Sequence, residues 1–180
     1  HILFHLDDGG STGRDLYSVT LRQTQGSPAP VGPPVAIPRP GNDFYPILSP
    51  NGQYVAYMSD RSGNFEVYVR PFPGGRGEWK VSVGGGTHAR WNGQGDELFY
   101  AAPDSNMMMV VKVDTRSNRF GHESPQQLFS LEQTELHSAV GSSRSYYDVT
   151  PDGQRFVMIR GNQSSTKGKL TVVQNWRRNR

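Results

Sequence analysis

The residues most suited to chemistry lie in a repeated pattern with two carboxylates. Its first form is Asp60-x-x-Gly63-x-x-Glu66-x-Tyr68, and paired carboxylates bind cations or act as acid and base. The pattern is echoed earlier in the chain by Asp8, Gly13, Asp15 and Tyr17. One active site would not need two copies, so we interpret these as structural turn residues. An aspartate that follows a strand accepts backbone N–H bonds in the next turn, and the glycine supplies a positive φ.

Other potential reaction centres are weaker. Gly9–Gly13 matches the G-x-S-x-G sequence of a hydrolase nucleophile, but that motif requires a following helix, and the next residues read as a strand. The chain has no cysteine. Its five histidines never stand at a spacing that brings two ring nitrogens to one metal. The sequence therefore predicts no catalytic residue, no metal site and no cofactor.

Charge and hydropathy argue against two further classes. The formal net charge is +3, and the excess lies in Arg177, Arg178 and Arg180 at the end of the chain. We interpret this segment as a solvated tail, because nucleic-acid binding requires a basic face or stripe. No apolar run approaches the ~20 residues of a membrane helix. We therefore expect neither nucleic-acid binding nor membrane insertion.

A repeated turn indicates the scaffold. Ser49-Pro50-Asn51-Gly52-Gln53 returns as Thr150-Pro151-Asp152-Gly153-Gln154, and each copy leads into a run of β-forming residues. Proline followed by Asn-Gly or Asp-Gly favours a tight turn between antiparallel strands. A third copy at Asn92–Asp96 lacks the proline. Turns repeated at this spacing predict the four-stranded blades of a β-propeller.

Four units align on this turn, at about residues 1–40, 44–84, 87–130 and 146–176, with an insertion loop at 131–145. The first unit begins inside its second strand, at Ile2–Leu6, and the fourth ends before its outermost strand. The predicted fold is all-β: one domain over 1–180 that forms a partial propeller of about three and a half to four antiparallel four-stranded blades. Within the insertion, 131–140 has helix-like spacing, but a polar loop is the preferred interpretation.

In this scaffold, one set of side chains is expected at the mouth of the central channel. Tyr45, His88 and Tyr146 occupy matching places in the innermost strands of their units, with Arg90 and Asp148 nearby. We predict these five as ligand-binding residues, because propellers present loops at the two ends of a channel. The alternative is that they pack between the blades or form their rim.

The sequence also resembles a known family. The run LSPNGQYVAYMSD at 48–60, followed by GNFEVYVRPFP at 63–73, is similar to the TolB-like, WD-repeat-like propellers. GGGTHARW at 84–91 and ELFY at 97–100 resemble the branch that follows some bacterial serine/threonine kinases, and YDVTPDGQRF at 147–156 with LTVVQNW at 170–176 matches the way those propellers end. The turn at Asp7–Gly10 departs from the family pattern. The resemblance implies the C-terminal part of a propeller of about six to eight blades.

These observations favour a non-catalytic module that binds a protein, a peptide or another ligand. Two alternatives stay open. One is an enzyme-associated propeller, either the gating domain of a peptidase or an accessory domain of a metal-dependent lyase. The other is a self-assembling half-propeller whose partner is a second copy of the chain, giving a homodimer. The family resemblance favours a periplasmic or other extracytoplasmic location.

Overall fold

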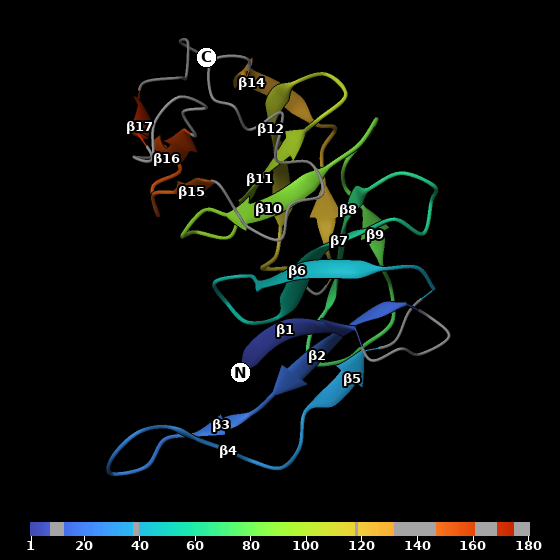
Figure 1. Ribbon diagram of the computed structural model, residues 1–180, viewed down its shortest axis with the longest axis vertical. Coiled ribbons are helices and arrows are strands. Elements are labelled where there is room, and N and C mark those ends of the chain that lie inside the picture. Colours follow the sequence, from blue (N-terminus) through green and yellow to red (C-terminus); the bar gives the residue numbers. More distant parts are fainter. Residues whose placement is uncertain (8–12, 38–39, 118, 132–146, 161–168, 175–180) are drawn as a thin grey trace.

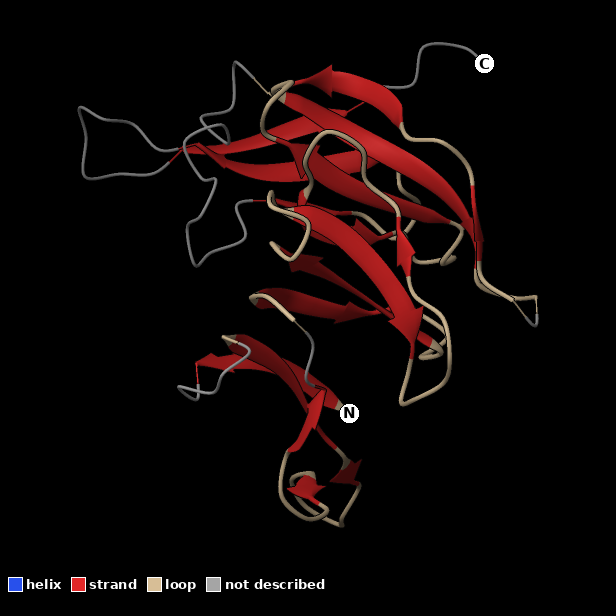
Figure 2. Cartoon of the chain, turned by 90° about the vertical axis from the view of Figure 1, so that its right-hand side faces the viewer, coloured by secondary structure: helices blue, strands red, loops and turns tan. Residues whose placement is uncertain are grey.

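The computed structural model describes residues 1–7, 13–37, 40–117, 119–131, 147–160 and 169–174, and the regular structure in these ranges consists of strands (Figure 2). The strands form four sheets that succeed one another in chain order, together with one small hairpin (Figure 1). This arrangement confirms the all-β propeller architecture predicted from the sequence. None of the described residues forms a helix long and apolar enough to cross a membrane.

Short antiparallel strands build the first two sheets. The first sheet has the order β1 (Ile2–Asp7), β2 (Arg14–Val19), β5 (Val35–Ile37). The second has the order β6 (Asp43–Leu48), β7 (Tyr54–Ser59), β8 (Glu66–Pro71), β9 (Trp79–Lys80). In the first sheet, β2 ends at Val19. Beyond it, β3 (Leu21–Arg22) pairs with β4 (Ala29–Pro30) in a separate hairpin.

The third sheet departs from the simple four-stranded plan. It contains β10 (Thr87–Trp91), β11 (Glu97–Ala102), β12 (Met107–Asp114), β13 (Gly121–His122) and β14 (Gln126–Ser130). Both β13 and β14 pair with β12, so the outer strand is divided in two. The fourth sheet has the order β15 (Tyr147–Val149), β16 (Arg155–Arg160), β17 (Lys169–Gln174). The predicted insertion at 131–145 lies outside the described residues, except for the buried Leu131.

The repeated turn has the same geometry in three sheets. In the second sheet, the Ser49 N–H donates to the Tyr54 carbonyl at 2.8 Å and the Gly52 N–H donates to the Ser49 carbonyl at 2.8 Å. Gly52, Gly95 and Gly153 have φ angles of 70°, 71° and 68°. This left-handed conformation suits glycine, which has no Cβ to clash. The third copy of the turn therefore keeps its shape although its sequence differs.

One side chain replaces two in the third turn. The Asn92 side-chain oxygen accepts hydrogen bonds from the Asp96 N–H at 3.1 Å and the Glu97 N–H at 3.2 Å. In the second sheet this role is divided, since Asn51 accepts from the Gln53 N–H and Ser49 accepts from the Tyr54 N–H. The amide of Asn92 thus satisfies the donors at the start of β11 without a hydroxyl residue.

The third turn lacks the proline of the other two turns for a different reason. Gly93 stands where the other turns have Pro50 and Pro151, and its N–H donates to the Pro151 carbonyl at 2.7 Å. A Cβ at Gly93 would lie 2.8 Å from the Pro151 Cβ. Because proline has no N–H and would also collide here, the contact between the third and fourth turns requires glycine.

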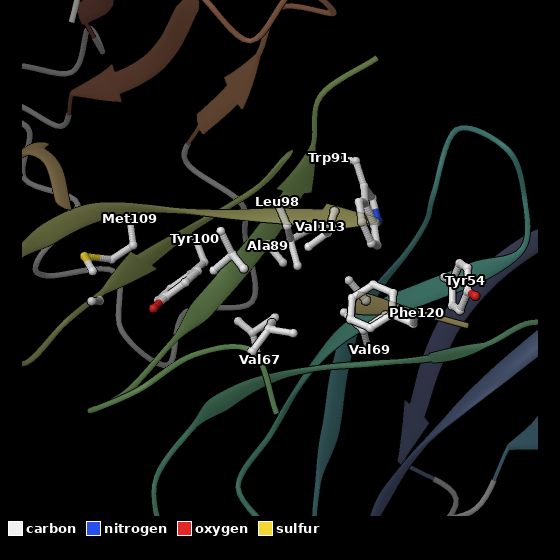
Figure 3. Close-up of a cluster of buried hydrophobic side chains, with 14 residues drawn as sticks. Tyr54, Val67, Val69, Ala89, Trp91, Leu98, Tyr100, Met109, Val113 and Phe120 are labelled. Carbon is white, nitrogen blue, oxygen red and sulfur yellow. The ribbon is translucent and has the colours of Figure 1, made fainter. Parts of the chain in front are cut away.

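Apolar side chains on facing surfaces hold successive sheets together. The largest cluster joins the second sheet to the third, and Figure 3 shows side chains from both sheets converging on it. Its fully buried members include Val67, Val69 and Leu98. A second cluster joins the third sheet to the fourth through Phe99, Met108, Phe156 and Met158. A third joins the first sheet to the second through Leu16, Ile37, Tyr57 and Tyr68.

We predict that Leu98→Ala lowers the free energy of unfolding by about 2–5 kcal/mol, because it leaves a cavity between two sheets. Urea unfolding followed by tryptophan fluorescence measures this change. The matched control is Val83→Ala, at a side chain that is 69% exposed, where we expect a change within about 0.5 kcal/mol. Equal effects of the two substitutions would contradict the assignment of Leu98 to the core.

Candidate functional site

Tyr45 and His88, two of the predicted ligand-binding residues, occupy equivalent irregular positions. Each lies in the first strand of its sheet, β6 or β10, where the register with the next strand shifts. Their φ angles are 50° and 53°, in the left-handed region where a residue with a side chain is strained. The alignment of the units predicted that Tyr45 and His88 occupy matching sites. The structure shows in addition that the backbone is distorted in the same way at both sites.

A row of rings crosses the first three sheets at this position. The ring centroid of His5 lies 5.4 Å from that of Tyr45, and the Tyr45 centroid lies 4.7 Å from that of His88. Burial lowers the pKa of His5, and the positive charge of Arg14 lowers it further. Both effects favour the neutral form of the His5 imidazole. The row of rings packs the first three sheets together. Ligand contact by Tyr45 and His88 stays a prediction.

The remaining predicted residues form a separate contact. Arg90 Nε lies 3.7 Å from Asp148 Oδ1, which connects the third and fourth sheets. The Asp148 side chain is 78% exposed, and ion pairs of this kind contribute about 0–1 kcal/mol. Tyr146 lies outside the described residues. The structure thus brings the predicted set together as two pairs, Tyr45 with His88 and Arg90 with Asp148.

Tyr147, which sequence reasoning did not select, links the two pairs. Its hydroxyl donates to the His88 carbonyl at 2.6 Å, and the Arg90 guanidinium lies 5.9 Å from its ring centroid. Complete burial raises the pKa of the Tyr147 hydroxyl above its ordinary value, so it remains a donor at neutral pH. The sequence contained two adjacent tyrosines here, but it gave no sign that the ring of Tyr147 would be buried.

The predicted turn residues make structural contacts, beginning with Asp60. Its two carboxylate oxygens accept hydrogen bonds from the backbone N–H and the side-chain amide of Asn42, both at 2.7 Å. Asn42 in turn accepts from the Arg14 N–H at 3.2 Å. The Asp60 carboxylate therefore binds the connection before β6. From the sequence we had expected it to bind the turn that follows Asp60. Gly63, with φ 97°, closes that turn through a backbone hydrogen bond to Asp60.

Glu66 and Tyr68, the other members of the pattern, also have partners close by in the second unit. The Glu66 carboxylate accepts hydrogen bonds from Lys80 Nζ at 3.2 Å and from the Ser82 hydroxyl. The Tyr68 hydroxyl donates to Ser62 Oγ at 3.0 Å. These contacts favour a structural role for the pattern over paired acid–base chemistry.

A buried polar group lies between the first two sheets. The Tyr57 hydroxyl donates to the Glu78 carboxylate, and Arg61 Nη2 lies 2.5 Å from Glu78 Oε1. Desolvation raises the pKa of the fully buried Asp43 to about 6, and the negative charges of Glu78 and Asp15 add to the rise. The Ser59 hydroxyl and the Arg61 guanidinium oppose it. Burial therefore disfavours the ionised form of Asp43, although Ser59 and Arg61 favour it.

We predict a pH dependence from Asp43. Its folded-state pKa of about 6 lies above the ordinary value of 3.8, so its stabilising contribution is complete below pH ~4 and is lost as the pH rises to about 6. Asp43→Asn should leave stability nearly unchanged at pH 4. At pH 7.5 it should raise the free energy of unfolding by about 1–3 kcal/mol.

Urea titrations at a series of pH values measure the difference between the variant and the parent protein. The control is Asp104→Asn at an exposed aspartate in the turn between β11 and β12, where we expect no such difference. A constant offset between Asp43→Asn and the parent protein at every pH would contradict the assignment.

A concave acidic depression lies between the turns of the third and fourth sheets. Its volume is about 610 Å³. Its charged lining comprises Asp96, Glu97, Asp114, Glu123, Asp152 and Lys112. His122 also lies in its wall. Carboxylates thus predominate at this place in a chain whose overall formal charge is +3.

Two of these carboxylates are held ionised by their own turns. Asp114 accepts hydrogen bonds from the backbone N–H groups of Ser117 and Arg116, which hold its pKa below the usual range. The Thr150 hydroxyl and the Gln154 N–H do the same for Asp152. Because these hydrogen bonds favour the charged form, Asp114 and Asp152 stay ionised across the neutral and mildly acidic range.

The acidic depression lies at the opposite end of β10 from the row of rings. His88 is near the start of that strand, and Asn92, which lines the depression, follows its last residue. Sequence reasoning interpreted Asp96 and Asp152 as turn residues alone. The sequence did contain a signal for this depression. The equivalent turns of neighbouring units both carry an aspartate, and equivalent turns lie at the same end of their sheets.

No group of three or more His, Asp or Glu side chains among the described residues is arranged to hold a metal ion. The carboxylates of the depression come from two turns, the start of β11, the end of β12 and the residue after β13. The described lining therefore presents a broad negative surface.

Successive antiparallel sheets with face-to-face cores define the class of β-propeller proteins. No family model matches the chain, and no curated protein matches it. Among solved structures, the chain is similar to a candidate TolB protein from Agrobacterium tumefaciens, with 14% identity and a TM-score of 0.58, over 97% of this chain and 58% of that one. The likeness to this structure shows that the chain has a β-propeller fold.

Two further solved structures are similar. A candidate 6-phosphogluconolactonase from Bacteroides uniformis has 12% identity and a TM-score of 0.52, over 89% of this chain and 48% of that one. TolB from Acinetobacter baumannii has 12% identity and a TM-score of 0.43, over 96% of this chain and 49% of that one. This chain thus spans about half the length of the solved chains that it matches.

Proposed function

We propose that this propeller is a non-catalytic binding module and that its acidic depression receives a cationic segment of a protein partner. The observation that supports this most directly is the depression itself, an open surface of about 610 Å³ in which five carboxylates accompany one lysine. Its volume falls in the ~300–1,000 Å³ range of ligand sites. Lysine and arginine side chains complement such a surface electrostatically.

The distribution of charge favours a peptide segment over a single compact cation. Asp114 and Asp152 each accept hydrogen bonds from their own turns, and Asp96 accepts one from the Asn92 amide at 2.6 Å. These oxygens are therefore fixed apart on a rigid rim and do not converge on one point. An extended segment with several basic side chains reaches such separated charges without rearrangement.

The fold supports the same class of function. Propellers present binding surfaces at the ends of their sheets on a rigid scaffold, and the depression is built from such turns. The resemblance to propellers that follow bacterial kinases is consistent with a binding domain displayed outside the membrane. The similarity to a candidate lactonase has 12% identity, a level at which only the fold is shared.

The test uses a fluorescent octalysine peptide and measures fluorescence anisotropy at 20 and 200 mM NaCl. We expect binding that weakens with salt, because surface attraction is screened. The variant Asp96→Asn/Glu123→Gln, which removes two charges from exposed parts of the depression, should weaken binding about three- to tenfold, since each exposed charge contributes about 0.2–1 kcal/mol.

The matched control is Asp104→Asn, which removes one exposed negative charge outside the depression. It is compared with Asp96→Asn alone and should bind octalysine like the parent protein. Equal weakening by Asp104→Asn and Asp96→Asn, or binding that the double variant leaves unaffected, would overturn the proposal.

A further inference from the structure

The described carboxylates of the acidic depression differ in their burial. Four of them belong to exposed residues, which we call the rim: Asp96, Asp114, Glu123 and Asp152. Glu97 also lines the depression, but it is only 7% exposed. One carboxylate of the site is thus largely removed from water while the other four remain in it.

The third turn holds Glu97 in place. Glu97 is the first residue of β11, and its N–H donates to the Asn92 side-chain oxygen at 3.2 Å. Its carbonyl accepts from the Asn92 N–H at 3.0 Å. The Asn92 side-chain amide also lies 3.4 Å from Glu97 Oε2, as a donor. The backbone and the carboxylate of Glu97 are therefore both oriented by one residue before any ligand binds.

The carboxylate of Glu97 reaches the turn of the fourth sheet. A Cβ at Gly153 would lie 2.9 Å from Glu97 Oε2 and 3.4 Å from Phe99 Cζ. The backbone of the fourth turn and the fully buried ring of Phe99 therefore lie close to this carboxylate. In such surroundings a charge is screened less by water and salt than a charge on the rim.

A basic side chain of the protein already stands beside Glu97. Lys112 is its direct partner in the ladder between β11 and β12, and it also lines the depression. Directly opposite residues point to the same side of a sheet. A carboxylate offers about four acceptor positions, so it can bind a ligand cation while it keeps contacts within the protein.

We propose that Glu97 anchors one ammonium group of the cationic segment, and that the rim carboxylates attract and orient the segment; this inference rests on the proposed function. A desolvated ion pair mainly determines how fast a complex dissociates, whereas exposed charges determine the association rate and the salt dependence. The partner is therefore a segment in which one lysine side chain inserts at Glu97 and further basic residues follow the rim.

The test compares Glu97→Gln with the rim variant Asp96→Asn/Glu123→Gln in the octalysine titrations at 20 and 200 mM NaCl. Glutamine has nearly the same shape as glutamate, and its side-chain carbonyl can still accept from the Asn92 amide. Glu97→Gln should raise the dissociation constant about tenfold or more at both salt concentrations, because a buried pair is little screened. The rim variant should lose most of its effect at 200 mM.

Stopped-flow anisotropy gives a second readout that a merely structural role would not produce. Glu97→Gln should increase the dissociation rate constant and leave the association rate constant within about twofold of the parent value. The rim variant should mainly lower the association rate constant. Near-ultraviolet circular dichroism and thermal unfolding establish that each variant is folded.

The matched control is Glu66→Gln, which removes another buried carboxylate, 5% exposed, at the start of β8 and outside the depression. It should bind octalysine within about twofold of the parent protein, because Glu66 has its partners, Lys80 and Ser82, within the second unit. A weakening equal to that of Glu97→Gln would show that loss of any buried carboxylate has this effect, and would overturn the inference.

Two further results would overturn the inference while the proposed function stands. One is a rim variant that weakens binding when Glu97→Gln changes the dissociation constant less than about threefold. The other is an effect of Glu97→Gln that disappears at 200 mM NaCl, as expected for an exposed charge. A parent protein that does not bind octalysine at 20 mM NaCl would overturn the proposed function itself, and the anchor with it.

Discussion

Burial of sheet faces is the constraint on which this structure depends. A sheet of three to five short strands has two faces and cannot cover either of them alone, so each face must be covered by a neighbour. The three buried clusters all lie between successive sheets. Polar side chains buried between or within the sheets either find a local hydrogen-bond partner, as Glu66 does, or have a raised pKa because of burial, as Asp43 does.

The same constraint explains how much the sequence revealed. Turn residues are local, so the copies at Ser49 and Thr150 predicted both the turns and the strands that follow them. The third copy was recognisable as a turn, but its stabilisation was not, because Asn92 combines roles that two residues perform elsewhere. The divided outer strand of the third sheet was missed, since β13 has only two residues and no pattern of its own.

The functional surfaces were harder to predict for a physical reason. Tyr45 and His88 were placed at matching positions from sequence, but their left-handed backbone depends on the register shift within each sheet. The acidic depression combines residues up to sixty positions apart, from Asn92 to Asp152. Such a surface exists only after the sheets have stacked, and no local spacing encodes it.

Gly93 shows what this stacking means for the units as modules. Its N–H and its lack of a Cβ fit one neighbour, the proline of the fourth turn, while the second unit keeps a proline at the same place. The units are therefore similar in shape but adapted to their order. Duplicating or exchanging units would preserve the strands but disturb the contacts between neighbouring turns. The units of this chain are therefore no longer interchangeable.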